Sequence, residues 1–474
     1  MEIPMPPHMT DTSPQPGLRN NWHLLLKIAI VCALGLLLLV PLLMVHGTLR
    51  ERQAREAEAV ASITGPWGGT QQLAGPVLVV PYTFEAETEE TAFVDGRRVV
   101  EKKTREQAGE AFFLPEQLEI KGDATTSERR RGIYTAHVYA ADLAITGRFA
   151  APDWKFLDGL RGLKPQWERA RVGVAISDLR GARGALTLKW AGADVPLQPG
   201  ARLDGFSHGV HAAVPLAAGQ AVEFALPLAL NGSGSLMVAP LARQTRVELR
   251  SPWPDPSFGG AYLPVRREVG PQGFAAAWEV SYYGRSFPQQ WADDGAGARP
   301  GAGELQATAF GVTLAEPVNA YRMTERAVKY GVLFIALVFT AFFLFEAVGG
   351  ARLHGLNYLL VGLALCLFFL ALLALAEVVG FGAAYAVAAT GATALVAGYA
   401  RAVLRSGRRA LAVGGLLGGV FGYLFFVLRM EDYALLAGTA ALAAMLAAVM
   451  FATRRLGADG RVSDSSATEK EVRT

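Results

Sequence analysis

The segment Gly205–Gly209 (GFSHG) matches the G-x-S-x-G pattern of serine hydrolases, in which the central serine is the nucleophile. That chemistry needs a strand before the serine and a helix after it, so that the hydroxyl group stands on a sharp turn. Here residues 210–216 (VHAAVPL) have the composition of another strand, and the preceding residues are typical of a loop. We therefore expect a glycine-rich turn between strands, and we predict no catalytic residue.

Two histidines of this region, His208 and His211, are candidate metal ligands. On a strand, side chains three positions apart point to opposite faces, which is unsuitable for shared ligation. No cysteine or further histidine follows nearby, and the chain has neither a P-loop nor an H-E-x-x-H motif. We therefore predict no metal site and no cofactor, and we expect that the protein is not an enzyme.

The composition indicates a membrane protein rather than a soluble one. Of the 474 residues, 51% are hydrophobic and only 18% are charged, whereas soluble domains carry about 25% charged residues. The net charge of +3 is too small to favour a nucleic acid as partner. The two cysteines, Cys32 and Cys366, lie in apolar stretches, so we expect buried thiols and no disulfide framework.

Apolar stretches of membrane-spanning length lie at both ends of the chain. A helix needs about 20 mainly apolar residues to cross the hydrocarbon core. The first stretch is too long for a cleaved signal peptide, so we expect an uncleaved anchor that Pro41 kinks. We predict one N-terminal and five C-terminal transmembrane helices, with spans at residues 24–45, 330–348, 356–376, 381–400, 410–428 and 434–452.

The basic residues predict the orientation of these spans, because cytoplasmic loops carry an excess of Lys and Arg. If six helices cross, one side receives most of the short-loop cations: Arg19, Lys27, Arg352, Arg401, Arg405, Arg408, Arg409, Arg454 and Arg455. The opposite short loops are not net basic and carry Glu377, Arg429, Glu431 and Asp432. We therefore expect both termini in the cytoplasm and the large central segment outside it.

The central segment has the period-two alternation of β-strands. Strand patterns occur at residues 76–83, 132–149 (two strands' worth), 172–178, 185–190, 222–230, 247–249, 274–283 and 305–314. Asp95-Gly96 lies between two further short strands and is a strong hairpin signal. Residues 48–62 have a helical pattern that Gly65-Pro66 ends. We expect a large β-rich domain, a sandwich or a curved sheet, that forms one or two folding units.

These patterns predict five parts of the chain. Residues 1–21 are a disordered tail, residues 22–46 contain the first transmembrane helix, and residues 47–325 form the β-rich domain. Residues 326–455 contain the five remaining transmembrane helices, and residues 456–474 form a second disordered tail. The segment at residues 292–303 is expected to be a flexible loop or a boundary.

Ionisable residues are rare within the spans, which disfavours a transporter of polar solutes. Glu346 and Glu377 lie at span ends, where both side chains are expected to reach the membrane interface. An apolar bundle remains compatible with lipid handling or small-molecule transport. A partner-dependent sensor is a further alternative, with candidate membrane-junction residues Glu325, Arg326, Lys329 and Glu346.

Two polar clusters of the central segment are candidate interaction surfaces. Glu128 precedes three arginines in a row, which could bind an anionic envelope component. The structural alternative is that these charges mark a solvated sheet edge. The segment 252–268 (PWPDPSFGGAYLPVRRE) concentrates Trp, Tyr and Arg, the residue types of binding hot spots, and its structural alternative is a stiff loop packed on the sheet. The candidate interaction residues are Arg129, Arg130, Arg131, Trp253, Asp255, Tyr262 and Arg267.

The chain resembles the CreD family of bacterial inner membrane proteins, also called cell envelope integrity proteins. The resemblance covers most of the chain and follows the segments Thr64-Gly65-Pro66, 73–81 (LAGPVLVVP), 131–134 (RGIY), 141–143 (ADL), 177–181 (SDLRG), 231–236 (NGSGSL), 251–263 (SPWPDPSFGGAYL), Arg267-Glu268, 321–330 (YRMTERAVKY), 342–346 (FFLFE) and 352–365 (RLHGLNYLLVGLAL). Residues 1–17 and 295–303 depart from the family pattern. The family has no assigned active site to carry over to this sequence.

The resemblance implies a multi-pass protein of the bacterial inner membrane with its large domain in the periplasm. It implies a role in envelope integrity and stress response, since expression in that family falls under the CreBC two-component system, and altered levels affect colicin tolerance and β-lactam response. We therefore expect the β domain to act as a non-enzymatic interaction module. Its expected partners are the lipid bilayer and a periplasmic protein, membrane protein or envelope component.

Overall fold

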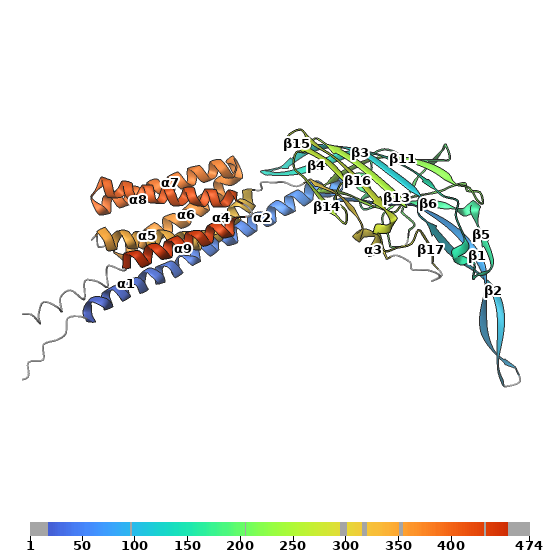
Figure 1. Ribbon diagram of the computed structural model, residues 1–474, viewed down its shortest axis with the longest axis horizontal. Helices are drawn as coiled ribbons and strands as arrows, with labels where there is room; N and C mark the ends of the chain where they lie inside the picture. Colours follow the sequence, from blue (N-terminus) through green and yellow to red (C-terminus); the bar gives the residue numbers. More distant parts are fainter. Residues whose placement is uncertain are drawn as a thin grey trace, which may run out of the picture. The chain divides into compact units, whose positions relative to one another are not determined.

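The computed structural model describes residues 18–94, 97–203, 205–293, 301–314, 320–349, 354–430 and 433–453 of the chain. They divide into two compact units, a helical unit drawn from Met1–Arg55 and Val318–Thr474, and a β unit within Glu56–Pro317. Figure 1 colours them along the sequence. Several predicted features lie outside the described residues: the tails up to residue 17 and from residue 454, Asp95-Gly96, Arg352, Glu431, Asp432, Arg454 and Arg455.

The helical unit combines the start of the chain with its last third. Its helices are α1 (Leu18–Leu37), the first part of α2 (Leu39–Trp67), α4 (Ala320–Lys329), α5 (Gly331–Gly349), α6 (Gly355–Val379), α7 (Phe381–Leu404), α8 (Gly407–Arg429) and α9 (Ala434–Thr453). Helix α1 begins at Leu18, four residues before the predicted start of the first transmembrane segment at residue 22. The break at Leu38 agrees with the predicted kink, because Pro41 has no N–H to donate to the carbonyl of Leu37.

The described helices confirm a membrane protein with several apolar C-terminal helices. Four of them are long and apolar enough to span a membrane: Leu26–Trp67, Gly355–Val379, Phe381–Val403 and Gly407–Arg429. Helices α4 and α5 meet at a bend of 46° and pass the same test only as a pair. In α9 the apolar stretch is the shorter Leu436–Ala447. Six crossings therefore stay a prediction.

Aromatic rings fill the centre of the helical unit. The ring of Phe421 on α8 lies 4.9 Å from that of Phe334 on α5 and 4.6 Å from that of Phe368 on α6. Leu38 is buried in the same cluster, and a side chain at Gly362 of α6 would collide with it. The N-terminal helix thus packs closely against helices that follow it by about three hundred residues, as small residues allow in membranes.

The β unit contains two sheets that share one core. The ten-stranded sheet contains β1 (Gln71–Val94), β2 (Arg97–Phe113), β5 (Arg161–Pro165), β6 (Arg171–Ile176), β9 (Gln198–Pro199), β10 (Gly209–Ala213), β12 (Ser235–Ala239), β14 (Pro256–Gly260), β17 (Gln290–Ala292) and β18 (Phe310–Leu314). The eight-stranded sheet has the order β15 (Arg266–Gly270), β16 (Gly273–Ser281), β13 (Gln244–Ser251), β3 (Gln117–Arg131), β4 (Tyr134–Phe149), β11 (Val222–Ser233), β7 (Thr187–Trp190) and β8 (Ala193–Pro196). The predicted β-rich domain is confirmed.

Strand β1 is buried on both faces along its first half. Leu78 and Val80 face the core between the sheets, whereas Val77 and Val79 face a second core on the other side of the ten-stranded sheet. This arrangement explains the continuous apolar run of the sequence at this point, because a strand covered on both faces has no polar side.

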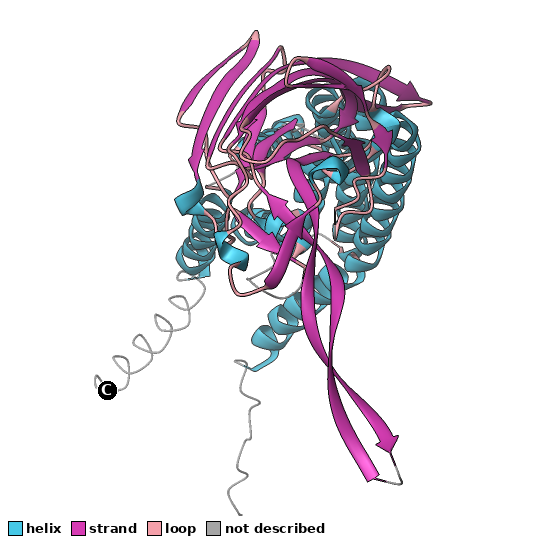
Figure 2. Cartoon of the chain, turned by 90° about the vertical axis from the view of Figure 1, so that its right-hand side faces the viewer, coloured by secondary structure: helices cyan, strands magenta, loops and turns pink. Residues whose placement is uncertain are grey.

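Strands β1 and β2 continue past the body of the sheet as a long two-stranded arm (Figure 2). Their pairing runs from Leu78 opposite Phe113 to Val94 opposite Arg97, which agrees with the predicted hairpin. The neighbouring strand β5 pairs with β1 only as far as Glu85. The described side chains of β2 on the arm, residues 102–108, are all exposed.

Two strand predictions and one loop alternative differ from the structure. The pattern at residues 132–149 forms one long strand, β4, after a turn at residues 132–133, because β3 pairs with it from Tyr134 to Arg148 and β11 from Val138 to Phe149. The pattern at residues 305–314 begins with a short helix, α3 (Ala302–Ala307), whose Leu305 is buried in the second core, and only then becomes β18. The segment 252–268 contains β14 and the start of β15 rather than one loop.

Candidate functional site

The serine of the G-x-S-x-G segment does not lie on a nucleophile elbow. Strand β10 follows it directly, so no helix begins behind the hydroxyl group. The Oγ of Ser207 lies 2.8 Å from Nδ1 of His208, and both residues are exposed on the same turn. His211 is buried, and its Nδ1 lies 2.6 Å from the carbonyl oxygen of Gly200. Each histidine therefore has its own partner, and His208 lies on the turn before β10 rather than on one strand with His211.

The predicted arginine cluster lies at the tip of the β3–β4 hairpin. The guanidinium of Arg129 lies 4.4 Å from the centre of the Trp67 ring, at the end of α2. The Nη1 of Arg131 donates a hydrogen bond of 2.7 Å to Oγ of Ser62, and Arg130 pairs with Glu128 at 3.0 Å. Arg129 and Arg131 thus bind the last turns of α2 to the sheet, which is a structural role.

The segment 252–268 passes from one sheet to the other, since β14 belongs to the ten-stranded sheet and β15 to the eight-stranded one. The indole N–H of Trp253 donates a hydrogen bond to the carbonyl of Asp255. The Trp253 ring lies 4.8 Å from the ring of His137, which lies opposite Glu128 in the β3–β4 hairpin. The hydroxyl of Tyr262 donates to the carbonyl of Gly284. These contacts stabilise a crossover, and Arg267 is exposed on β15.

The candidate junction residues of the helical unit pair with other helices. The Glu346 carboxylate on α5 forms an ion pair with Lys27 of α1 and accepts a hydrogen bond of 3.0 Å from the Tyr358 hydroxyl of α6. Its side chain is 11% exposed, so it is held inside the unit rather than reaching freely to an interface. Glu325 pairs with Lys329 at 2.9 Å and accepts from Gln53 of α2, while Arg326 is half-buried on α4.

A similar arrangement surrounds Glu377 at the end of α6. Its carboxylate lies 3.6 Å from the Arg52 guanidinium of α2 and accepts a hydrogen bond of 3.0 Å from the Tyr321 hydroxyl of α4. The side chain is 13% exposed. Glu346 and Glu377 therefore connect the N-terminal helices to the C-terminal ones near opposite ends of α6.

A buried polar cluster lies where α2 leads into β1. Gln71 is 1% exposed, and its amide donates to the carbonyl oxygens of Asp178 and Asn231 at 3.0 Å each. The Arg180 guanidinium, together with the backbone N–H of Gly69, lowers the pKa of the Asp178 carboxyl to about 2. Segments 177–181 and 231–236, which carry the family resemblance, therefore meet beside the end of α2 in a structural cluster.

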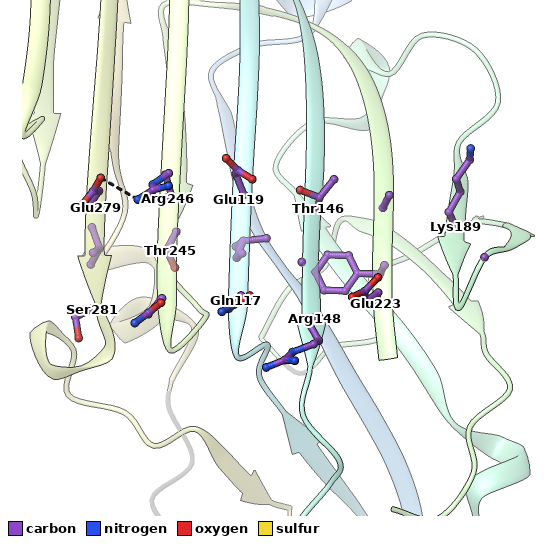
Figure 3. A pocket seen from close by; sticks show the side chains of 17 residues that line it. Gln117, Glu119, Thr146, Arg148, Lys189, Glu223, Thr245, Arg246, Glu279 and Ser281 are labelled. Carbon is purple, nitrogen blue, oxygen red and sulfur yellow. Dashed lines mark hydrogen bonds and ion pairs between the residues drawn. The ribbon is translucent and has the colours of Figure 1, made fainter. Parts of the chain in front are cut away.

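The structure shows a larger candidate site on the outer face of the eight-stranded sheet. A hollow of about 1060 Å³ lies over β16, β13, β3, β4, β11 and β7 (Figure 3). Its walls carry three carboxylates and three cationic groups: Glu119, Glu223, Glu279, Arg148, Lys189 and Arg246. We call this hollow the polar trough. The side chains on the opposite face of the same strands form the core, as period-two alternation requires.

The strand register aligns the trough residues in rows. Glu279 of β16 lies opposite Arg246 of β13, which lies opposite Glu119 of β3. The same row continues through Thr146 of β4 and Ala225 to Lys189 of β7. Arg246 and Glu279 form an ion pair of 3.2 Å, drawn as a dashed line in Figure 3. Small side chains thus occupy the middle of the row, with charged groups on both sides.

Opposite charges also alternate along the parallel pair β13 and β3. Arg246 lies opposite Glu119, Glu248 opposite Lys121 and Arg250 opposite Asp123. Cross-strand pairs of this kind favour one register over its alternatives. A second hollow of about 610 Å³ adjoins Asp123 and Arg250 at the other end of these strands. The outer face of β13 and β3 is therefore polar along its length and carries both signs of charge in alternation.

Sequence reasoning missed the polar trough although a signal was present. Polar residues alternate with apolar ones at residues 117–123 and 244–250, which marks one exposed and one buried face for each strand. Only the centre of the second stretch was predicted as a strand, and the parallel pairing of two segments so far apart has no local sequence signal. Without that pairing, nothing in the sequence indicates that Glu119 and Arg246 lie opposite each other.

The trough carries groups that can bind a polar ligand. Its side chains offer carboxylate, guanidinium, ammonium, amide and hydroxyl groups, which bind ligands by hydrogen bonds and ion pairs. Among the described residues, no three His, Cys, Asp or Glu side chains form a group that could hold a metal ion. The described residues thus present an open polar surface as a candidate binding site.

Comparison with known proteins gives a consistent match. The family described as inner membrane protein CreD matches residues 23–458. The Escherichia coli (strain K12) protein named inner membrane protein CreD is 33% identical over 425 residues, which cover 89% of this chain and 90% of that protein. The match therefore includes both the helical unit and the β unit.

Proposed function

We propose, since the chain belongs to the CreD family of inner membrane proteins, that it contributes to cell envelope integrity through its β unit. Membership makes it an envelope-associated protein of the inner membrane, and the described apolar helices agree with that location. In this proposal the helices anchor the protein, and the β unit is a non-enzymatic module that binds an envelope component at the polar trough.

The polar trough is the observation that carries the proposal. Recognition sites use a few well-placed polar groups to fix a ligand, and the trough provides them from six adjacent strands whose backbone is held by the sheet. By contrast, the one serine motif of the chain lacks the helix that an activated nucleophile needs. Binding is therefore the function that this surface supports best.

The proposal places both termini in the cytoplasm and the β unit in the periplasm, with six membrane crossings. The contacts of the helical unit support this order. Lys27 and Glu346 meet at one end of α6, near Tyr358, and Arg52 meets Glu377 at its other end. Helices α1, α5 and α6 therefore alternate in direction as sequential crossings require, and the excess of Lys and Arg assigns the Lys27 end to the cytoplasm.

Complementation in cells tests the proposal. Cells that lack the gene receive the wild-type protein, a Thr146→Trp variant that fills the trough, a Thr104→Trp variant on the exposed arm, or a Ser207→Ala variant. Uptake of a dye that intact envelopes exclude is then measured. We expect wild type, Thr104→Trp and Ser207→Ala to restore exclusion and Thr146→Trp to fail at equal protein levels. Full restoration by Thr146→Trp, or failure of Ser207→Ala, would contradict the proposal.

Lipid handling by the helices is a second candidate, because an apolar hollow of about 530 Å³ lies between α7 and α8. Its walls are mainly small and aromatic side chains, including Ala389, Gly418 and Phe421. Reconstituted protein that moves labelled lipid across vesicles, and loses this activity when Ala389→Trp fills the hollow, would favour the second candidate. Lipid movement that is the same with wild type and with empty vesicles would exclude it.

A further inference from the structure

We infer that the polar trough binds an uncharged glycan chain that lies across the outer face of the eight-stranded sheet. The inference rests on the proposed function and adds the chemical class of the ligand. Three properties of the trough support this inference. They are the balance of its charges, the hydrogen bonding of its main-chain groups within the sheet, and the small side chains in the middle of its floor.

The charges of the trough sum to zero, because Glu119, Glu223 and Glu279 oppose Arg148, Lys189 and Arg246. Several of these groups are already neutralised within the protein. Arg246 pairs with Glu279 at 3.2 Å, Arg148 with Glu116 at 2.9 Å, and Glu119 with Lys121 at 3.0 Å. A polyanion or polycation would meet as much repulsion as attraction here, so the surface favours a ligand without net charge.

The backbone of the trough is not available to a peptide. An extended peptide usually binds by adding a strand to a sheet edge, where main-chain groups are unpaired. Strands β13, β3, β4 and β11 each have a neighbour on both sides, so their main-chain groups bond within the sheet. Recognition must therefore use side chains. Carboxylate, amide and guanidinium groups can bond the many hydroxyl groups of a sugar, which act as donors and acceptors.

The middle of the trough floor is made of small side chains, because Thr146 of β4 lies opposite Ala225 of β11. On one side of this pair lies the trough pair Arg148 with Glu223, and on the other side, beyond the lining of the trough, lies the exposed pair Ala144 with Pro227. The strip of Thr146 and Ala225 is bounded by Glu119 on one side and Lys189 on the other, and the two bounding strands are three strand spacings, or about 14 Å, apart. A sugar ring can place its C–H face on such a floor and its hydroxyl edges against the charged walls. Sheet faces of other folds bind oligosaccharides.

Binding of an N-acetylglucosamine oligomer to the full-length protein in detergent micelles tests the inference. We expect saturable binding that is about tenfold weaker in the Thr146→Trp variant, which fills the floor, and weaker in Lys189→Ala, which removes a wall donor. The matched controls Thr104→Trp and Lys155→Ala change exposed residues away from the trough and should bind like wild type. An unchanged thermal midpoint of each variant shows that the fold is intact.

The outcomes separate the inference from the proposed function. Binding of dextran sulfate or of a mixed-charge peptide in place of the neutral oligomer would overturn the glycan inference. So would oligomer binding that Thr146→Trp leaves unchanged. If the oligomer does not bind but Thr146→Trp still fails in cells, the inference is wrong and the proposed function stands. If the oligomer binds at the trough but Thr146→Trp restores the envelope fully, the proposed function fails.

Discussion

Asp178 shows how a single residue holds the β unit together where α2 leads into β1. Its carboxylate accepts hydrogen bonds from the Arg180 guanidinium, at 2.7 Å to Nη2, and from the backbone N–H of Gly69 at 3.2 Å. Its backbone carbonyl accepts from the buried amide of Gln71. The residue therefore links the entry of the first strand to the turn after β6. Charges at such positions contribute to the free energy of unfolding rather than to catalysis.

We expect this contribution to depend on pH. Because Arg180 lowers the folded-state pKa of Asp178 to about 2, below the ordinary value of 3.8, the carboxylate stabilises the fold fully above pH 4. That stability is lost as the pH falls toward 2, where the carboxylate becomes protonated. The Asp178→Asn variant should thus lose about 1–2 kcal/mol at pH 7, since Arg180 is exposed and solvent screens the pair.

Chemical denaturation of the full-length protein, followed by tryptophan fluorescence, measures this effect. The difference between wild type and Asp178→Asn should shrink steadily between pH 4 and pH 2. Asp142→Asn is the control, because that carboxylate is 71% exposed and pairs with Arg183 on the surface. A difference that stays constant with pH would show that the Asp178 charge is not the source of the stabilisation.

At the scale of elements, the connection from α2 to β1 depends on one glycine. Gly68 follows the last residue of α2 with φ of +101°, a conformation that residues with a side chain rarely adopt. A Cβ atom at this position would lie 2.8 Å from both the Asn231 carbonyl oxygen and Gly181 Cα. The helix can therefore approach the two segments that carry the family resemblance only because residue 68 has no side chain.

The Gly68→Ala variant should be strongly destabilised, by about 2–4 kcal/mol, since backbone strain and the collision add. Gly69→Ala is the matched control, because its Cβ would meet only the Asp178 carboxylate, at 3.9 Å. We expect the control to lose less than about 1 kcal/mol. Thermal unfolding of both variants in detergent measures the difference, and equal midpoints would contradict this account of the connection.

The ion pair of Lys27 with Glu346 joins the first helix to the C-terminal helices. Either single exchange places two like charges beside each other at a partly buried site, so we expect Lys27→Glu or Glu346→Lys alone to lower stability by about 1–3 kcal/mol. The double exchange Lys27→Glu with Glu346→Lys should recover most of this loss. Lys329→Glu, at a lysine that is 63% exposed, is the control and should have a small effect.

The amount of monodisperse protein after heating in detergent gives a suitable measurement for this series. Recovery in the double exchange would establish that α1 packs against α5 through this pair. Single variants that are as stable as wild type would contradict the packing of the N-terminal helix that the structure shows. So would a double exchange that leaves less monodisperse protein than either single variant.

At the scale of the whole molecule, the sequence predicts the features that depend on composition and local period. Apolar stretches of about 20 residues identify membrane helices, and alternation identifies strands such as β11 and β16. The pairing of β1 with β2 follows from the Asp-Gly turn signal. The two-unit plan and the family were therefore accessible before the structure.

Features that depend on contacts between distant segments were not accessible in this way. The arginines at residues 129–131 have the composition of a binding surface, and only the structure shows Trp67 and Ser62 beside two of them. Likewise, the charges of β3 and β13 form a candidate site only once their parallel register is known. Long strands such as β4 also exceed the usual length, because partners on both sides support them.

We propose that the β unit faces the periplasm and that envelope material occupies its polar trough. The most direct test of this proposal is thiol labelling with a membrane-impermeant maleimide, in a protein whose Cys32 and Cys366 are replaced by serine. One cysteine is then introduced on the trough floor, as Ala225→Cys, or on the exposed arm, as Thr104→Cys. The ratio of their labelling rates is compared between intact cells and purified protein.

We expect both positions to be labelled in intact cells without lysis of the inner membrane. We also expect Ala225→Cys to be labelled several times more slowly relative to Thr104→Cys in cells than in the purified protein, because a ligand covers the trough. Labelling that requires inner-membrane lysis would contradict the periplasmic location. An equal ratio in cells and in the purified protein would contradict occupancy of the trough.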